Sequence, residues 1–164
     1  HFNKSIEINP NNKDAYLRRG SLNMKIKDYK RAIFDFTKAI ELNPNDINTY
    51  KLVALLKNNL KDFRGAIDVY NIAIKLDPND SKLYFNRANL KLKVNNYLGS
   101  IDDYDHSIKI NPKFIEAYRN RAIAKWHLGD ESGSCDDQKT LILMGDVNTK
   151  KWINSLPGKR CREM

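Results

Sequence analysis

Few side chains suited to catalysis or metal binding occur in the chain, and they are scattered. The three histidines are His1, His106 and His127. None of them has a spacing to cysteine or carboxylate that is typical of a metal site. The chain also lacks the Gly-x-x-x-x-Gly-Lys-Ser/Thr loop that binds phosphate. Asp102, Asp103 and Asp105 form a carboxylate run, which is typical of a solvated helix face. The pattern therefore favours a protein that is not an enzyme and uses no metal or cofactor.

The two cysteines, Cys135 and Cys161, form neither a metal-ligand spacing nor a disulfide framework. Cys135 aligns with isoleucines of the repeats described below, so we expect a small buried apolar residue there. Unpaired cysteines favour a reducing compartment, and the cytoplasm is the expected location. The chain begins inside a repeat and resembles a fragment, so an upstream targeting signal stays open.

One six-residue phrase recurs along the chain: a small residue, isoleucine, a charged residue, an aliphatic residue, Asn or Asp, and proline. It occupies 5–10, 39–44, 73–78 and 107–112, which places the prolines 34 residues apart. A fixed period in this range indicates a repeat array. Asn or Asp tolerates a turn, and proline ends a helix and can open the next segment. The phrase therefore predicts a junction between helices.

Alignment on these prolines brings similar residues into shared columns. The aromatic columns hold Tyr16, Tyr50, Tyr84 and Tyr118, then Tyr29, Phe63 and Tyr97, then Phe36, Tyr70 and Tyr104. The small-residue columns hold Gly20, Ala54, Ala88 and Ala122, then Ala32, Ala66, Ser100 and Ser134, then Ala39, Ala73 and Ser107. Each block has helical spacing on both sides of a polar break such as Lys27-Asp28, which predicts two helices of roughly 12–14 residues. Each block is thus a hairpin that must stack on its neighbours, and the tyrosines are expected in the core.

This order of small, aromatic and proline columns resembles the tetratricopeptide repeat, abbreviated TPR. The resemblance covers about residues 1–145, and the phrases Tyr118–Ala122 and His127–Asp130 are similar to the bacterial branch of the family. It implies an all-α fold, a right-handed superhelix or solenoid of antiparallel helical hairpins.

The predicted organisation follows the period. Residues 1–12 are expected to be the second-helix remnant of an upstream repeat. Four repeats then follow, at 13–46, 47–80, 81–114 and 115–146.

The fourth repeat is divergent, as terminal repeats often are. Glu131 and Gln138 stand where aromatic residues are expected. Gly145 and Asp146 predict a helix C-cap and an N-cap for a capping helix over 147–156. Trp152 and Ile153 of that helix are expected to cover the open end of the core, and a basic tail occupies 157–164.

In this family the first helices of the hairpins line a concave groove that binds partners. The resemblance directs the second, fifth, sixth, ninth, twelfth and thirteenth residues of each block into the groove. Six of these residues are Lys or Arg and two are Asp or Glu, so the expected groove is basic. Asn side chains there offer a donor and an acceptor to an extended peptide. The expected peptide-binding residues are Arg18, Ser21, Lys51, Leu55, Lys82, Phe85, Asn86, Asn89, Arg119, Asn120 and Ile123. Trp126 and His127 are weaker candidates.

One subclass of the family binds the acidic C-terminal tails of chaperones through five Lys, Arg and Asn positions. Lys51 and Asn86 match this clamp, whereas Leu55, Glu116 and Asn120 do not. Binding of chaperone tails is therefore disfavoured.

The net charge of +9 and the pI near 9.5 favour acidic partners without selecting their class. No apolar run approaches the roughly 18 residues that span a bilayer. The leading expectation is a protein-interaction scaffold that binds an extended acidic or neutral peptide. The alternatives are an RNA-binding helical repeat protein and a structural module that self-associates end to end. The proline period and the expected burial of the tyrosines argue against RNA.

Overall fold

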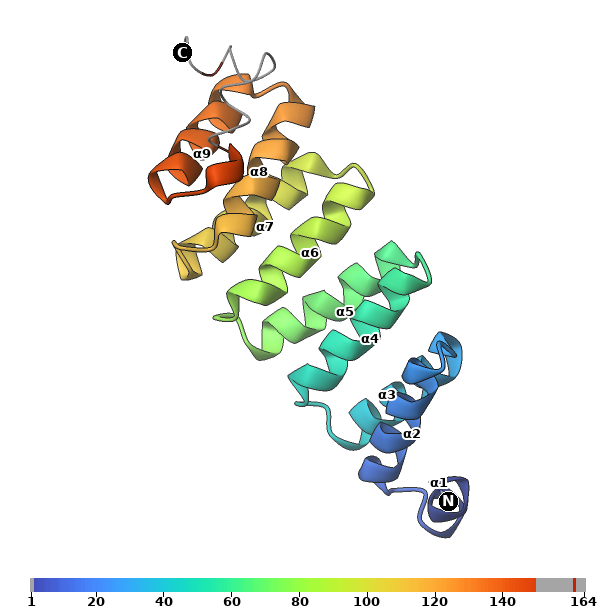
Figure 1. The fold of residues 1–164 in the computed structure, drawn as a ribbon. Helices are drawn as coiled ribbons and strands as arrows, with labels where there is room; N and C mark the ends of the chain where they lie inside the picture. Colours follow the sequence, from blue (N-terminus) through green and yellow to red (C-terminus); the bar gives the residue numbers. More distant parts are fainter. Residues whose placement is uncertain (1, 150–160, 162–164) are drawn as a thin grey trace. The chain divides into compact units, whose positions relative to one another are not determined.

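The computed structural model of the chain describes residues 2–149 and Cys161. Its helices, shown in Figure 1, are α1 (Phe2–Ile8), α2 (Lys13–Lys25), α3 (Tyr29–Leu42), α4 (Ile47–Asn59), α5 (Phe63–Leu76), α6 (Ser81–Lys93), α7 (Tyr97–Ile110), α8 (Ile115–Leu128) and α9 (Glu131–Leu143). This part of the chain contains no β-strand, so the expected all-α class is confirmed. None of its helices is both long and apolar enough to cross a lipid bilayer.

The helices pack as consecutive antiparallel hairpins in two compact units, one ending at Pro78 and the other starting at Asn79. In the first unit, α2 pairs with α3, α4 pairs with α5, and α3 packs against α4. In the second unit, α6 pairs with α7, α8 pairs with α9, and α7 packs against α8 (Figure 1). Each unit is therefore a stack of hairpins, as the expected solenoid requires.

A residue with left-handed backbone separates the two helices of every hairpin. Its φ is +62° at Lys27, +61° at Lys61, +59° at Asn95 and +86° at Gly129. The residue that follows is the N-cap of the second helix, and its side chain accepts a hydrogen bond from the backbone N–H three residues later. These caps are Asp28, Asp62, Asn96 and Asp130. The polar break therefore both turns the chain and starts the next helix.

The recurring phrase joins one hairpin to the next. The Asn or Asp before each proline has extended φ, as proline requires of its predecessor: −144° at Asn43 and −138° at Asp77. Two residues after the proline, Asp46 and Asp80 cap the next first helix with their carboxylates. Phe114 occupies the same position and makes no side-chain cap.

Small and aromatic columns build the core together. In the first unit Ala32 and Phe36 pack with Val53 and Leu56 of α4. A Cβ atom added to Gly20 would lie only 2.9 Å from Phe36 Cε1, which explains the small residue in that column. In the second unit Ala88 and Tyr104 pack with Ala117 and Ala124.

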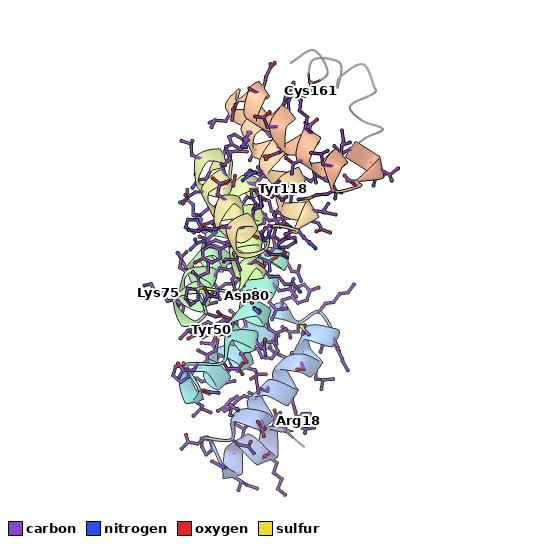
Figure 2. All side chains as sticks on the ribbon, turned by 90° about the vertical axis from the view of Figure 1, so that its left-hand side faces the viewer. Arg18, Tyr50, Lys75, Asp80, Tyr118 and Cys161 are labelled. Atoms are coloured by element: carbon purple, nitrogen blue, oxygen red, sulfur yellow. A yellow bond between two sulfur atoms is a disulfide. The ribbon has the colours of Figure 1, made fainter. Side chains whose placement is uncertain are left out.

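The tyrosines divide into two sets by burial. Four are buried, namely Tyr16, Tyr50, Tyr70 and Tyr104, and the other four are half-buried. Figure 2 labels Tyr50 and Tyr118, which occupy the same column. The half-buried rings of Tyr84 and Tyr97 stack on His106 and His127.

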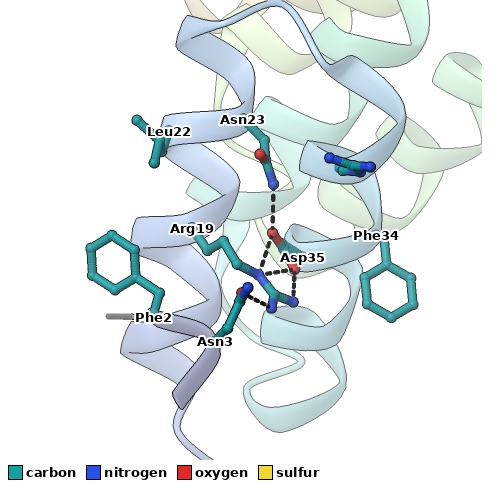
Figure 3. A pocket seen from close by; sticks show the side chains of 8 residues that line it. Phe2, Asn3, Arg19, Leu22, Asn23, Phe34 and Asp35 are labelled. Carbon is teal, nitrogen blue, oxygen red and sulfur yellow. Dashed lines mark hydrogen bonds and ion pairs between the residues drawn. The ribbon is translucent and has the colours of Figure 1, made fainter. Parts of the chain in front are cut away.

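Buried ion pairs link the two helices of three hairpins. Arg19 Nη2 lies 2.6 Å from Asp35 Oδ1, and Figure 3 shows Arg19 and Asn23 converging on this carboxylate. The same two columns pair Arg87 with Asp103 at 2.6 Å and Arg121 with Asp137.

The expectation of a solvated carboxylate run was wrong for Asp103, which is only 1% exposed. Arg87 and Lys91 both pair with this carboxylate, and the two cations compensate the burial of its charge. Its neighbours Asp102 and Asp105 are exposed as expected. Helical geometry explains the difference, because residues one and two positions apart face different directions.

A disulfide joins Cys135 to Cys161, with a Cα–Cα distance of 5.2 Å; Figure 2 labels Cys161. The expectation that these cysteines stay unpaired was therefore wrong. Two cysteines 26 residues apart carry no pairing signal, since the bond depends on where the fold places them. Cys135 is buried, as expected, at 1% exposure. The expectation of a reducing compartment assumed unpaired cysteines, so the bond removes the argument for it.

The fourth hairpin ends at Met144, the C-cap of α9, one residue before the expected Gly145. Gly145 has φ of +86°, directly after α9 and its cap. The Asp146 carboxylate accepts hydrogen bonds from Thr149 N and Oγ1, and residues 147–149 are helical. The rest of the predicted capping helix, with Trp152 and Ile153, lies outside the described residues, as does the tail apart from Cys161.

Candidate peptide-binding surface

The predicted site residues fall into two groups, one in each unit. Arg18 and Ser21 of α2 and Lys51 and Leu55 of α4 belong to the first unit. The second unit holds Lys82, Phe85, Asn86, Asn89, Arg119, Asn120 and Ile123, which lie on α6 and α8.

In the first unit, α2 lines a hollow of about 570 Å³. Five of the six positions expected to face inward in this block line it: Asp14, Leu17, Arg18, Ser21 and Lys25. Arg18, labelled in Figure 2, is exposed there, whereas Ser21 Oγ donates to the Leu17 carbonyl oxygen at 2.8 Å. The α2 side chains therefore form one continuous surface of mixed charge.

On α4, Leu55 is exposed and Lys51 is half-buried.

In the second unit, a hydrogen bond joins the two first helices directly. Asn120 Nδ2 of α8 donates to Asn89 Oδ1 of α6 at 2.8 Å. The same oxygen accepts the hydroxyl of the buried Tyr104, at 2.6 Å. Burial raises the pKa of the Tyr104 phenol well above its usual value, so the hydroxyl stays a donor. The core thus fixes the position of Asn89, and Asn89 fixes that of Asn120.

Beside this pair, Phe85 provides an aromatic surface. Its ring centroid lies 4.6 Å from that of Phe114 and 6.0 Å from that of Tyr104. Phe85 is half-buried, so one part of the ring packs on the core and another part faces solvent.

The basic groups of this surface differ in their surroundings. Lys82 is exposed at the start of α6. Arg119 Nη2 lies 3.1 Å from Asp146 Oδ2, an ion pair that the sequence did not reveal. Hydrogen bonds from Thr149 first, and then the contact with Arg119, lower the pKa of the Asp146 carboxyl. Lys82 is therefore the more accessible cation for an incoming acidic group.

The remaining candidates also have defined positions. Asn86 is half-buried, and Ile123 and Trp126 are both exposed. The His127 ring stacks on Tyr97 with centroids 5.0 Å apart, which orients it toward α7. Among the described residues, no group of three His, Cys, Asp or Glu side chains is arranged to hold a metal ion.

Comparison with known proteins gives matches that agree with this architecture. Two tetratricopeptide-repeat family models match residues 14–46 and 69–101. No curated protein sequence shows significant similarity to the chain.

Solved structures share the fold at low sequence identity. A crystal structure of MamA is 22% identical, with a TM-score of 0.80 over 91% of this chain and 87% of that one. MamA from Desulfovibrio magneticus RS-1 is 14% identical, with a TM-score of 0.77 over 88% and 81% of the two chains. The first TPR of Spaghetti (RPAP3) is 21% identical, with a TM-score of 0.65 over 71% and 93%.

The stacked antiparallel hairpins define a helical repeat protein of the all-α class. The chain therefore contains tetratricopeptide repeats, matched at residues 14–46 and 69–101, and its column pattern agrees with that family.

Proposed function

We propose that the chain is a non-enzymatic protein-interaction scaffold that binds an extended acidic or neutral peptide on its first helices. In the second unit this surface consists of Lys82, Phe85, Asn86 and Asn89 of α6 with Arg119, Asn120 and Ile123 of α8. Arg18, Ser21, Lys51 and Leu55 are the candidates in the first unit.

The observation that carries the proposal is the hydrogen-bonded pair of Asn89 and Asn120. Within the described part of the chain, Asn89 Nδ2 and Asn120 Oδ1 make no hydrogen bond. Both residues are partly exposed, so one amide donor and one carbonyl acceptor remain for a ligand. An extended peptide backbone presents the complementary C=O and N–H groups. Because Tyr104 already holds the pair in place, binding needs little further ordering of these side chains.

The charges next to this pair favour an acidic or neutral ligand. Lys82 is exposed, and Arg119 is paired with Asp146. A peptide carboxylate would meet Lys82 without displacing a partner seen in the structure, whereas contact with Arg119 would compete with Asp146. Lys82 is therefore the cation whose loss should weaken binding most.

A structural neighbour with a bound peptide supports the proposal. The structure of the first TPR of Spaghetti (RPAP3) contains an HSP90 peptide, SRMEEVD. Because Leu55, Glu116 and Asn120 depart from the chaperone-tail clamp, we expect a different peptide sequence to be preferred here.

The test is selection of peptides from a displayed library, followed by titration of the selected peptides into purified chain. We expect Lys82→Glu/Asn86→Ala to weaken binding about tenfold or more, since it reverses one charge and removes one amide. Lys109→Glu is the matched control, because it makes the same charge change at an exposed position of α7.

Unchanged affinity of the double variant, with an intact helical circular dichroism spectrum, would contradict the placement of the site. Single-stranded RNA at low salt is the second arm. Binding of that RNA that falls steeply with added salt would favour the RNA-binding alternative.

A further inference from the structure

The turns inside the two hairpins of the first unit lie at the same edge of that unit. The helices α2 and α4 run in the same direction, so their C-terminal ends and the turns that follow them are neighbours (Figure 1). This turn edge, residues 25–31 and 57–64, contains seven Lys or Arg and two Asp. The opposite edge, residues 9–14, 43–48 and 77–78, contains one Lys and three Asp. The positive charge of the first unit is therefore concentrated at the turn edge.

The two carboxylates of the turn edge already have cationic partners. Asp28 caps α3, and its Oδ2 lies 3.4 Å from Arg31 Nε. Asp62 caps α5, and its Oδ2 lies 2.7 Å from Lys57 Nζ. The other five cations of the edge are exposed and make no ion pair within the described residues: Lys25, Lys27, Lys30, Lys61 and Arg64. The edge therefore presents five cations to an incoming anionic surface.

Two of these lysines occupy a backbone conformation that does not suit them. Lys27 and Lys61 have φ of +62° and +61°, which is unfavourable for a residue with a Cβ atom. The fourth hairpin places Gly129 at the same position, where glycine avoids that cost. Residues that violate a local preference are expected at functional sites. The two lysines thus have a use other than forming the turn.

The second unit forms the same turn without these cations. In the two columns that hold Lys27 with Lys61 and Lys30 with Arg64, its residues are Asn95, Gly129, Leu98 and Ser132. The left-handed residue and the N-cap that follows it are nevertheless present in both of its hairpins. The turn geometry therefore does not explain the cations of the first unit.

An exposed aliphatic side chain stands directly before each left-handed lysine. Ile26, the C-cap of α2, is 65% exposed, and Leu60, the C-cap of α4, is 41% exposed. Aliphatic groups flanked by lysines suit the surface of a lipid bilayer. There the apolar groups enter the boundary of the acyl chains, and the cations stay with anionic head groups.

Nucleic acid uses only part of this chemistry. Single strands bind through aromatic rings that stack on the bases, together with cations that contact the backbone. The aromatic residues of the turn edge, Tyr29 and Phe63, are half-buried, and Tyr29 packs on the core of the first unit. The exposed Ile26 and Leu60 gain little from a phosphate backbone. An anionic bilayer employs both the cations and the aliphatic groups.

We infer that the turn edge of the first unit binds an anionic lipid surface. Ile26 and Leu60 enter the head-group boundary, and the five unpaired cations face the lipid phosphates and carboxylates. The inference goes beyond the proposed function, because none of the proposed peptide-binding residues lies within 25–31 or 57–64. A scaffold held in this way would bring its peptide partner to a membrane surface.

Co-sedimentation of the full chain with vesicles tests the inference. One set of vesicles contains phosphatidylcholine and phosphatidylserine in equal parts, and the other contains phosphatidylcholine alone. We expect binding to the anionic set that weakens with added salt, and much weaker binding to the neutral set.

Lys27→Gly/Lys61→Gly should lower the affinity for anionic vesicles about 25-fold, since each lysine near such a surface contributes about a factor of five. Glycine suits both turns, so this variant should keep its fold. The matched control, Lys109→Gln/Lys113→Gln, removes the same charge at exposed positions outside the turn edge. It should keep most of the affinity.

Ile26→Ser tests the apolar contact without changing the charge. It should lower the affinity for anionic vesicles about fivefold, because part of the isoleucine side chain no longer leaves water for lipid. Ile8→Ser is the matched control, since Ile8 is 76% exposed and lies outside the turn edge. An Ile26→Ser variant that binds as the unaltered chain does would overturn the inference.

Absence of binding to anionic vesicles, or an equal loss in the two lysine variants, also overturns it. If Lys27→Gly/Lys61→Gly loses affinity for single-stranded RNA and keeps its affinity for vesicles, the turn edge is a nucleic-acid surface instead. Lys82→Glu/Asn86→Ala should lose affinity for selected peptides and bind vesicles nearly as the unaltered chain does, so the two proposals fail separately.

Discussion

At the scale of residues, buried aspartates link the two helices in three of the hairpins. Asp35, Asp103 and Asp137 are each 3% exposed or less, and each meets an arginine from the first helix of its own hairpin. The second hairpin holds Val53 and Val69 in the same two columns, and Val53 is buried. The same two columns therefore hold an ion pair in three hairpins and two valines in the second hairpin.

This comparison predicts how substitutions of Arg19 and Asp35 combine. Arg19→Val should lower the free energy of unfolding by about 3 kcal/mol, because Asp35 would keep its buried charge with Asn23 as its remaining donor. Arg19→Val/Asp35→Val reproduces the valine pair of the second hairpin and should recover most of that loss. Urea unfolding followed by circular dichroism measures both. A double variant no more stable than Arg19→Val would show that the charge is not what destabilises the single variant.

At the scale of elements, the turn inside each hairpin is strained in some repeats and relaxed in another. Lys27, Lys61 and Asn95 adopt left-handed φ, whereas the fourth hairpin uses Gly129. A left-handed conformation costs a residue with a Cβ about 1 kcal/mol, a cost that glycine avoids. The turn geometry is thus retained across repeats although the residue type is not optimal.

We therefore expect Lys61→Gly to raise the free energy of unfolding by about 0.5–1 kcal/mol. The reverse exchange, Gly129→Lys, is the matched control and should lower it by a similar amount. Thermal and urea unfolding report both changes. A loss of stability in Lys61→Gly would mean that the lysine side chain makes a contribution larger than the backbone strain.

The cap at Asp146 should make the stability of the fold depend on pH. Its carboxyl pKa is lowered in the folded chain by Thr149 and Arg119. A depressed folded pKa stabilises the fold above the unfolded value near 3.9, and this stabilisation is lost as pH falls through the folded pKa.

Asp146→Asn keeps the shape of the cap and removes its charge. The variant should be less stable than the unaltered chain at pH 7, and the difference should shrink as the pH falls toward 2. Equilibrium unfolding at several pH values measures this difference, and ¹³C NMR of the Asp146 carboxyl gives its pKa. A difference that stays constant with pH would contradict a stabilising role of the Asp146 charge toward Thr149 and Arg119.

At the scale of the whole molecule, features that recur in every repeat can be predicted from the sequence, whereas features that occur once cannot. The hairpins can be predicted because small and aromatic columns recur every 34 residues: Gly20 lies against Phe36 in the first hairpin, and Ala88 packs with Tyr104 in the third. The burial of Asp103 was not read from the carboxylate run, although the matching of arginine and aspartate columns was a usable signal. The Cys135–Cys161 bond had no such signal, because it occurs once and depends on tertiary placement.

The first-helix positions of the site follow from the repeat register, whereas their interactions do not. The pairing of Asn89 with Asn120 joins residues of different blocks, and Arg119 pairs with Asp146 beyond the end of its own helix. Such contacts depend on how successive hairpins stack. The sequence therefore predicts which helices carry the candidate surface but not which of its side chains are already occupied.

The disulfide should stabilise the second unit. It closes a loop over a separation of 26 residues, for which chain entropy gives about 3.5 kcal/mol. Cys161→Ala should lower the unfolding midpoint under oxidising conditions and have little effect in the presence of dithiothreitol, where the unaltered chain also lacks the bond. Equal midpoints of the two proteins under oxidising conditions would contradict a stabilising bond.

The most direct test of the central claim is to map a selected peptide onto the chain by ¹⁵N NMR. If the first helices bind peptides, the largest shifts in the second unit should cluster on α6 and α8, at Lys82, Asn86, Asn89 and Asn120. The Asn89 and Asn120 side-chain amides should shift together, since they share one hydrogen bond. Shifts confined to the exposed faces of α7 and α9, with these amides unmoved, would contradict the proposed surface.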